Sequence, residues 1–301
     1  MFNIQLTTDK ITAVFYLVDE FCQAFTKSFD AHLIGNKPKK TPKMSDSEVI
    51  TILTLFHLGN FRNLKHFYLF YVQQHLIEDF PNTVSYNRFI ELSHKVCVPM
   101  TLFLKTCCLG ESTGISFVDS TPIRVCKNKR IYTNKVFKDI ANTGKSTVGW
   151  FYGFKLHLII NDKGEILNFV ITPANVDDRE PLKNPEFVNR IKGKLYADKG
   201  YMGKKLTELL FVDGLHLITS IRNNMKNVLM ELKDKILLRK RPVIETVNDE
   251  LKNMCQIEHP GHRSFKGFVA NTIAALIAYS FFPKKPSIKF NGVFTNQVTL
   301  F

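Results

Sequence analysis

The sequence lacks the features that mark secreted and membrane proteins. Its start, MFNIQLTTDK, has no basic stretch leading into an apolar run, so no signal peptide is predicted. The longest apolar stretch, 268–282, contains Asn271 and Thr272 and is shorter than the roughly 18 residues of a membrane span. A buried core helix fits this stretch better. We therefore expect a cytoplasmic protein with no membrane partner.

Cysteine is scarce and scattered. None of the six cysteines forms a C-x-x-C pair, which excludes a zinc knuckle and a thioredoxin-like redox motif. Scattered cysteines in a chain of this length are typical of reduced thiols. Apolar residues make up 45% of the chain and 26 residues are phenylalanine, so we expect a sizeable aromatic core.

Acidic residues are few relative to basic ones. Lys and Arg number 41 against 27 Asp and Glu, which gives a net charge of +14. An excess of this size opposes compactness through self-repulsion, so a polyanionic partner is its natural explanation. Solubility is the alternative explanation for part of it. Composition therefore favours a protein that binds nucleic acid.

Residues 1–110 predict an all-helical domain. Apolar residues follow helical spacing over 11–35, and Ser45 with Glu48 three positions later matches a capping box, which predicts a helix start. Residues 81–88 predict a turn followed by a helix with polar, basic outer positions. That helix is either the groove-reading helix of a helix-turn-helix or part of an ordinary helical hairpin.

After Gly114 the pattern changes to strands and helices. The turn at 161–164 predicts a hairpin, and 202–212 predicts a helix between two later strands. The order of three strands, helix, strand, helix, strand, helix indicates a mixed α/β sheet with helices packed on it. Strands are expected at 115–118, 154–160, 165–172, 194–197 and 215–221.

Two aspartates stand at the ends of predicted strands. Asp119 follows Ser116-Phe117-Val118, and Asp198 follows Leu195-Tyr196-Ala197. A buried unpaired carboxylate is costly, so each aspartate needs water, a cation or a metal ion. If the two strands are neighbours, both carboxylates lie at one edge of the sheet and form a ligand set that Mg²⁺ favours. The alternative is that each aspartate only caps the turn after its strand.

A third carboxylate lies on a predicted helix that begins near Pro242. Arg241, Glu245 and Lys252 are spaced by four and seven residues, so they share one face of that helix. The face would present one carboxylate between two cations; the alternative is a solvated surface with ion pairs along the helix. The apolar stripe is expected at Val243, Val247, Leu251 and Met254.

Basic residues gather between the first predicted strand and Trp150. With Tyr132 and Phe137 among them, they either follow a phosphate backbone and stack on bases or form a solvated loop. Trp150 itself is expected in the core or at a strand edge rather than stacked on a flipped base. The basic residues are Lys127, Lys129, Arg130, Lys135, Lys138 and Lys145.

Two other motifs contain histidine. Lys155 and His157 alternate onto one face of their strand, where they either contact phosphate near the metal ions or face solvent. The segment 259–262 reads His-Pro-Gly-His, but no third ligand is apparent nearby. It predicts a turn followed by a helix rather than a metal site.

Four motifs occur together in the order that a known family shows. They resemble the DDE transposases of bacterial insertion sequences and, more narrowly, the insertion-sequence nine-eighty-two group, over about residues 44–280. One departure is Leu238, which stands where related transposases carry a tyrosine that would contact a terminal phosphate. The motifs are Asp119-Ser120-Thr121, Gly153-Phe154-Lys155-Leu156-His157, Ala197-Asp198-Lys199-Gly200-Tyr201 and Arg241…Glu245…Lys252, together with the helix start Met44-Ser45-Asp46-Ser47-Glu48.

The resemblance implies a ribonuclease-H-like catalytic domain at 111–301 and a helical DNA-end-binding domain at 1–110. It implies Asp119, Asp198 and Glu245 as the catalytic triad and the ligands of two Mg²⁺ ions, for which Mn²⁺ would substitute. The implied reaction is metal-dependent cleavage at the element's ends and strand transfer into target DNA, both in-line displacements at phosphorus. Expected DNA contacts are Lys127, Lys129, Arg130, Lys155, His157, Arg241 and Lys252.

The implied partners are the terminal repeats of the element and the target DNA. The protein would act as a homo-oligomer on paired ends and would be associated with the bacterial nucleoid. Two other functions stay open: a nuclease on the same fold that cuts without joining, and an inactive copy that only binds DNA. The presence of all three carboxylates argues against the inactive copy.

Overall fold

The computed structural model describes residues 6–30, 42–220, 229–258, 261–288 and 298–300. The chain forms two compact units: unit 1 comprises Met1–Cys108 and Leu251–Phe282, and unit 2 comprises Leu109–Glu250 and Pro283–Phe301. No helix within the described residues is long and apolar enough to cross a membrane.

Unit 1 is helical. Its capping box is the one predicted: the Ser45 hydroxyl accepts from the Glu48 N–H at 3.1 Å, and the Glu48 carboxylate accepts from the Ser45 N–H at 2.6 Å. The long helices are α1 (Thr8–Asp30), α2 (Asp46–Leu58), α5 (Tyr86–Lys95), α6 (Cys97–Phe103) and α11 (Phe265–Ser280). Shorter helical segments are α3 (Leu64–His66), η1 (Phe67–Val72), α4 (Gln73–His75) and η2 (Leu104–Cys108).

Helix α11 is the centre of unit 1, where it packs against α2, α5 and α6. The expectation of a buried helix at 268–282 is therefore confirmed. The predicted catalytic domain, 111–301, includes this stretch, whereas the structure assigns it to unit 1 because the N-terminal helices cover the apolar surface of α11. Of the predicted turn before α11, His259 and Pro260 lie outside the described residues.

Helix α5 follows the turn predicted at 81–88. Ser85 is its N-cap, and the side chains of Phe89 and Leu92 are buried while Asn87 and Arg88 are exposed. An exposed polar face on a capped helix is compatible with a groove-reading helix and with an ordinary helical hairpin. Reading of a DNA groove by α5 stays a prediction.

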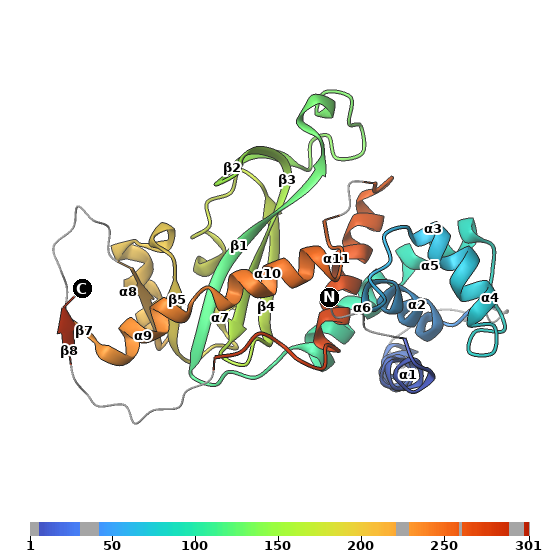
Figure 1. Ribbon diagram of the computed structural model, residues 1–301, viewed down its shortest axis with the longest axis horizontal. Coiled ribbons are helices and arrows are strands. Elements are labelled where there is room, and N and C mark those ends of the chain that lie inside the picture. Colours follow the sequence, from blue (N-terminus) through green and yellow to red (C-terminus); the bar gives the residue numbers. More distant parts are fainter. Residues whose placement is uncertain (1–5, 31–41, 221–228, 259–260, 289–297, 301) are drawn as a thin grey trace. The chain divides into compact units, whose positions relative to one another are not determined.

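Unit 2 is built on a mixed sheet with the order β2-β3-β1-β5-β6, in which β4 also pairs with β3 (Figure 1). Strands β1, β3 and β4 are antiparallel, whereas β5 and β6 run parallel to β1. Three antiparallel strands followed by two parallel ones in this order is the ribonuclease-H-like arrangement, as predicted. The strands are β1 (Ile115–Cys126), β2 (Asn142–Ser146), β3 (Gly149–Asn161), β4 (Ile166–Pro173), β5 (Gly193–Ala197) and β6 (Leu215–Thr219).

All five predicted strands are present, and β2 is an additional one. Its sequence, Asn-Thr-Gly-Lys-Ser, has no apolar alternation, so pairing with the start of β3 in a hairpin creates the strand. Gly144 allows this pairing because an added Cβ would lie 2.3 Å from the carbonyl oxygen of Ala174. Ile221, the end of the last predicted strand, lies outside the described residues.

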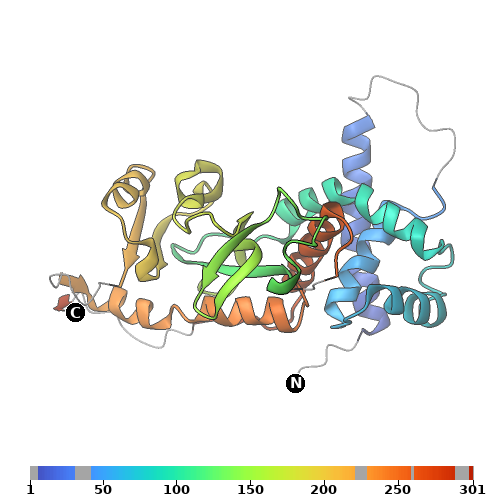
Figure 2. The same cartoon turned by 90° about the horizontal axis from the view of Figure 1, so that it is seen from above.

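Helices cover both faces of the sheet in unit 2, with α9 and α10 on one side and α8 on the other (Figure 2). Val118 and Leu195 are buried on the α8 side, whereas the Tyr196 hydroxyl donates to Asp234 of α9 at 2.7 Å. Because side chains alternate along a strand, Asp119 lies on the α10 side and Ser120 on the other. The remaining elements are η3 (Asn128–Arg130), η4 (Pro181–Lys183), α7 (Pro185–Val188), η5 (Lys199–Tyr201), α8 (Lys204–Val212), β7 (Leu229–Glu231), α9 (Leu232–Lys240), α10 (Val243–Asn253) and β8 (Val298–Leu300).

Candidate active site

Asp119 and Asp198 belong to neighbouring parallel strands. Phe117 of β1 pairs with Tyr196 of β5, so Asp119 and Asp198 each stand two residues beyond this last pair. The sequence predicted that Asp119 ends its strand, but the structure shows that it does not. Strand β1 keeps pairing with β3 as far as Cys126, beyond the end of β5. Asp198 is exposed directly after β5 and, among the described residues, makes no side-chain cap to η5.

Asp119 is a largely buried carboxylate with weak partners. Its side chain is 22% exposed; the Asn248 amide donates to Oδ2 at 3.3 Å, and Arg241 Nη1 lies 4.0 Å from Oδ1. Burial raises the pKa of Asp119 to about 6; Arg241 opposes this shift, and the charges of Glu245 and Asp178 add to it. The ionised form therefore has too little compensating positive charge around it.

Arg241 connects the third predicted carboxylate to the site. Its Nη2 donates to Glu245 Oε1 at 2.7 Å, and its Nη1 has no hydrogen-bond partner within the part of the chain that the structure describes. The sequence predicted one carboxylate between two cations, but here one cation stands between Asp119 and Glu245. Lys252 instead pairs with Glu258 at 3.7 Å, within unit 1.

The buried stripe of α10 is offset from the predicted one. Ile244, Val247 and Leu251 are fully buried, whereas Val243 and Met254 are only partly buried. The offset leaves Asn248 on the side of the helix that meets Asp119. Glu245 is one residue beyond the stripe, and its side chain is 54% exposed.

The fit of a metal ion depends on these carboxylates. Among the described residues, no three His, Cys, Asp or Glu side chains are gathered closely enough to hold an ion. The chemistry of the donors nevertheless suits a hard divalent cation, because Asp119, Asp198 and Glu245 supply carboxylate oxygens. A cation would also supply the positive charge that the buried Asp119 lacks. The chemistry of the donors therefore suits a divalent metal ion, although the described side chains are not gathered around one point.

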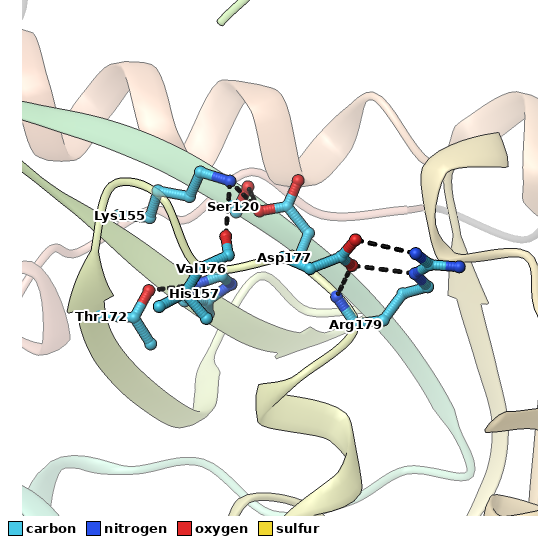
Figure 3. A network of polar contacts seen from close by, with 8 residues as sticks. Ser120, Lys155, His157, Thr172, Val176, Asp177 and Arg179 are labelled. Carbon is cyan, nitrogen blue, oxygen red and sulfur yellow. Dashed lines mark hydrogen bonds and ion pairs between the residues drawn. The ribbon is translucent and has the colours of Figure 1, made fainter. Parts of the chain in front are cut away.

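Asp178, in the loop after β4, is a carboxylate that the sequence did not predict. Its partners Ser120 and Lys155 belong to the polar network in Figure 3. Asp178 Oδ1 accepts from Ser120 Oγ at 2.8 Å and from Lys155 Nζ at 2.9 Å, and Nζ also donates to the Val176 carbonyl at 2.9 Å. Asp178 thus ties the residue after Asp119 to β3. The signal was the acidic pair at 177–178 after a predicted strand, but several residues separate that pair from the strand end.

Lys155 and His157 share a strand face, as predicted, but it is the face opposite Asp119. His157 pairs with Ser120 in the sheet, is 1% exposed and bonds to Thr172 Oγ1 at 2.9 Å. Burial lowers the pKa of His157 to about 4, so the ring is neutral. The predicted DNA contact by His157 is not supported, since no part of this side chain reaches the surface.

Lys155 has a different position. Its side chain is 14% exposed and lines a cavity of about 410 Å³ in unit 2, together with Lys145, Trp150 and Asp178. Trp150 is 61% exposed in the β2–β3 hairpin, with Lys145 Nζ 6.0 Å from its ring centroid. A cation and an aromatic ring therefore stand beside the Asp178 network.

The basic segment between β1 and β2 is exposed. Tyr132 is fully exposed, whereas Phe137 is 1% exposed and its carbonyl accepts from the Tyr152 hydroxyl at 3.0 Å. Phe137 is therefore a core residue and not the stacking platform that the sequence suggested. The exposed cations are Lys127, Lys129, Arg130, Lys135, Lys138 and Lys145.

Comparison with known proteins gives a family. No curated protein matches the sequence. Among solved structures, the chain is similar to a piggyBac transposase synaptic complex with hairpin DNA, at 9% identity over 89% of this chain and 72% of that chain, with a TM-score of 0.47. It is also similar to a Mos1 strand transfer complex, at 10% identity over 86% of this chain and 83% of that chain, with a TM-score of 0.29.

The family is shown by a sequence match rather than by the solved structures. A family model described as "Transposase DDE domain" matches residues 109–265. This range contains β1, β5 and all of α10, and with them all three predicted carboxylates. Because the match spans more than half of the 301 residues, the chain belongs to the transposase DDE domain family.

Proposed function

We propose that this transposase cuts DNA at the ends of an insertion sequence and joins the freed ends to target DNA, with Asp119, Asp198 and Glu245 as its catalytic carboxylates. The observation that carries the proposal is Asp119, a largely buried carboxylate that is connected to Glu245 through Arg241. A fold gains nothing from such an arrangement in the absence of a cation, because burial penalises the ionised carboxylate.

The family depends on a divalent metal ion, and for this chain we infer two Mg²⁺ ions, with Mn²⁺ as a substitute. Bound metal would activate the attacking oxygen and stabilise the leaving one. The attacking group would be water in cleavage and a terminal 3′-hydroxyl in strand transfer. Asn248 orients the Asp119 carboxylate, because its amide donates to Oδ2.

Arg241 is proposed to contact the scissile phosphate. Its side chain is only 15% exposed, and Nη1 has no hydrogen-bond partner among the described residues. A phosphate oxygen would give this donor a short charge-assisted bond. Arg241 would then neutralise the charge that develops on the phosphate while it keeps Glu245 in place.

Asp178 is proposed to position Lys155 and Ser120. It fixes the Lys155 ammonium at one wall of the 410 Å³ cavity and holds the residue next to Asp119. Lys127, Lys129 and Arg130 would contact duplex phosphates further away. Unit 1 is proposed to bind the ends of the element, and paired ends would be held by a homo-oligomer.

A joining assay tests this function. The full chain is incubated with Mg²⁺, pre-cut ends of its own element and a supercoiled target plasmid, and the joined products are counted. We expect joining that disappears in EDTA and in the Asp119→Asn variant. Nicking without joining would indicate a nuclease. DNA binding with neither activity would indicate an inactive copy.

A further inference from the structure

Unit 1 contains a cavity of about 640 Å³ that the proposed chemistry does not use. Residues of α2, α3 and α5 and of the start of α11 line it, all of them within unit 1. Its volume lies in the range of roughly 300–1,000 Å³ that is typical of sites for small ligands. The cavity is therefore large enough for a nucleotide-sized group.

The lining is cationic. No carboxylate is among the lining residues, all of which the structure describes, whereas Lys65 and Arg263 are. Lys65 Nζ lies 6.0 Å from the ring centroid of Tyr86. Burial raises the pKa of Tyr86, and the charge of Arg263 opposes that shift, so this guanidinium also acts on the Tyr86 ring. Two cations thus act on one aromatic side chain of the cavity wall.

The start of α11 adds to the positive potential. Ser264 caps this 16-residue helix, its hydroxyl accepting from the Gly267 N–H at 3.0 Å, and no acidic residue stands in the first turn. The amino end of a helix carries a partial positive charge that favours anions. At the same wall, Asn271 Nδ2 is a buried donor with no hydrogen-bond partner among the described residues.

From this lining we propose that the cavity binds a phosphate group of the DNA backbone, with Lys65 and Arg263 as its cations and Tyr86 against the adjoining sugar. Asn87 of α5 also lines the cavity, and Arg88 follows it on the exposed side of the helix. A phosphate held here would therefore bring the duplex to the first turn of α5. The proposal rests on the proposed function only in that DNA is the partner.

The experiment measures duplex binding by the full chain in EDTA, where cleavage cannot interfere. The double variant Lys65→Ala/Arg263→Ala is compared with wild type and with the matched control Lys95→Ala/Lys105→Ala, two exposed cations of unit 1 that do not line the cavity. We expect the slope of log affinity against log salt to fall by about 1–2 units in the cavity variant alone, since each lost phosphate contact is worth roughly 0.9.

Two results would overturn the proposal. One is a slope that does not separate the cavity variant from the control. Either the slope of the cavity variant is unchanged, or it falls equally in the control, which would indicate diffuse surface charge. The other is an unchanged slope combined with thermal stabilisation of wild type, but not of the cavity variant, by deoxyadenosine monophosphate. The cavity would then be a site for free nucleotides. The joining assay decides the proposed function separately, because it depends on Asp119 and not on Lys65.

Discussion

Two regions of the chain have opposite electrostatic requirements. One is the acidic edge of the sheet in unit 2, at Asp119 and Glu245, and the other is the cavity of unit 1 that Lys65 and Arg263 line. At the edge, Arg241 lies between Asp119 and Glu245, and burial raises the pKa of Asp119 to about 6, with the charges of Glu245 and Asp178 adding to the shift. In the cavity, Lys65 and Arg263 stand among lining residues that include no carboxylate, all of which the structure describes. Among the described residues, the edge thus has one cation, Arg241, for two carboxylates, whereas the cavity lining has cations and no carboxylate. We therefore expect substitutions at the edge to affect metal-dependent chemistry and substitutions in the cavity to affect DNA binding alone, so the two effects should be separable.

Replacing a catalytic carboxylate should have the largest effect. Asp119→Asn, Asp198→Asn and Glu245→Gln keep the side-chain shape but remove ligand charge, so each should lower cleavage by roughly 10³-fold or more while duplex binding is retained. Plasmid cleavage in Mg²⁺ and a binding titration measure the two effects. Asp249→Asn is the control, because Asp249 is an exposed acid on α10, the helix that carries Glu245. Cleavage at the wild-type rate by any of the three variants would remove that residue from the triad.

Replacing Lys127, Lys129 and Arg130 together with alanine should weaken DNA binding without changing sequence preference. All three are exposed at the end of β1, and phosphate contacts position a protein without reading bases. We expect the slope of log affinity against log salt to fall by about 2–3 units. Titrations at several salt concentrations measure it. An unchanged slope would show that this segment is a solvated loop and would limit phosphate binding to other surfaces.

Asp178→Asn should have a smaller effect than a triad substitution. The variant keeps an acceptor for Ser120 but loses the charge that holds the Lys155 ammonium, so we expect the turnover rate to fall roughly 10- to 100-fold with little change in the KM for DNA. Asp177→Asn is the matched control. Asp177 is the neighbour of Asp178 in sequence, and in the network of Figure 3 its side chain bonds only to Arg179. Equal rates for the two variants would show that Asp178 has no positioning role.

Asp119→Asn should also stabilise the metal-free fold at neutral pH. The folded pKa of Asp119, about 6, lies above its ordinary value of 3.8, so the protonated carboxyl favours folding below about pH 4 and this contribution is lost as the pH rises through 6. The loss is up to roughly 3 kcal/mol, and the variant should not show it. Urea unfolding in EDTA between pH 4 and 8 measures the difference. Parallel stability curves for the two proteins would contradict the burial argument.

Strand periodicity and capping chemistry were readable from the sequence. The Ser45–Glu48 capping box and the five strands follow from local patterns, and those patterns placed Asp119 and Asp198 next to buried strands. The hairpin strand β2 was not readable, because its residues show no apolar alternation and its pairing with β3 depends on the close approach of Gly144 to the Ala174 carbonyl. Local rules find elements that are stable by their own pattern and miss those that their neighbours create.

Side-chain roles were harder to predict than elements. Phe137 and His157 belong to patterns that suit DNA contact, yet both are buried, because the hairpin and the sheet cover them. Asp178 was missed since its loop carries no periodicity. The assignment of Leu251–Phe282 to unit 1 depends on packing between segments far apart in sequence, which no single motif encodes.

The proposal that Asp119, Asp198 and Glu245 hold the metal ions is tested most directly by measuring metal binding. Mn²⁺ bound to the full chain on duplex DNA can be counted by electron paramagnetic resonance, without any need for turnover. We expect two bound ions in wild type and in Asp249→Asn, and the loss of at least one ion in each of Asp119→Asn, Asp198→Asn and Glu245→Gln. Full binding in the Asp198→Asn variant, whose carboxylate is exposed in the structure, would contradict the assignment of the triad.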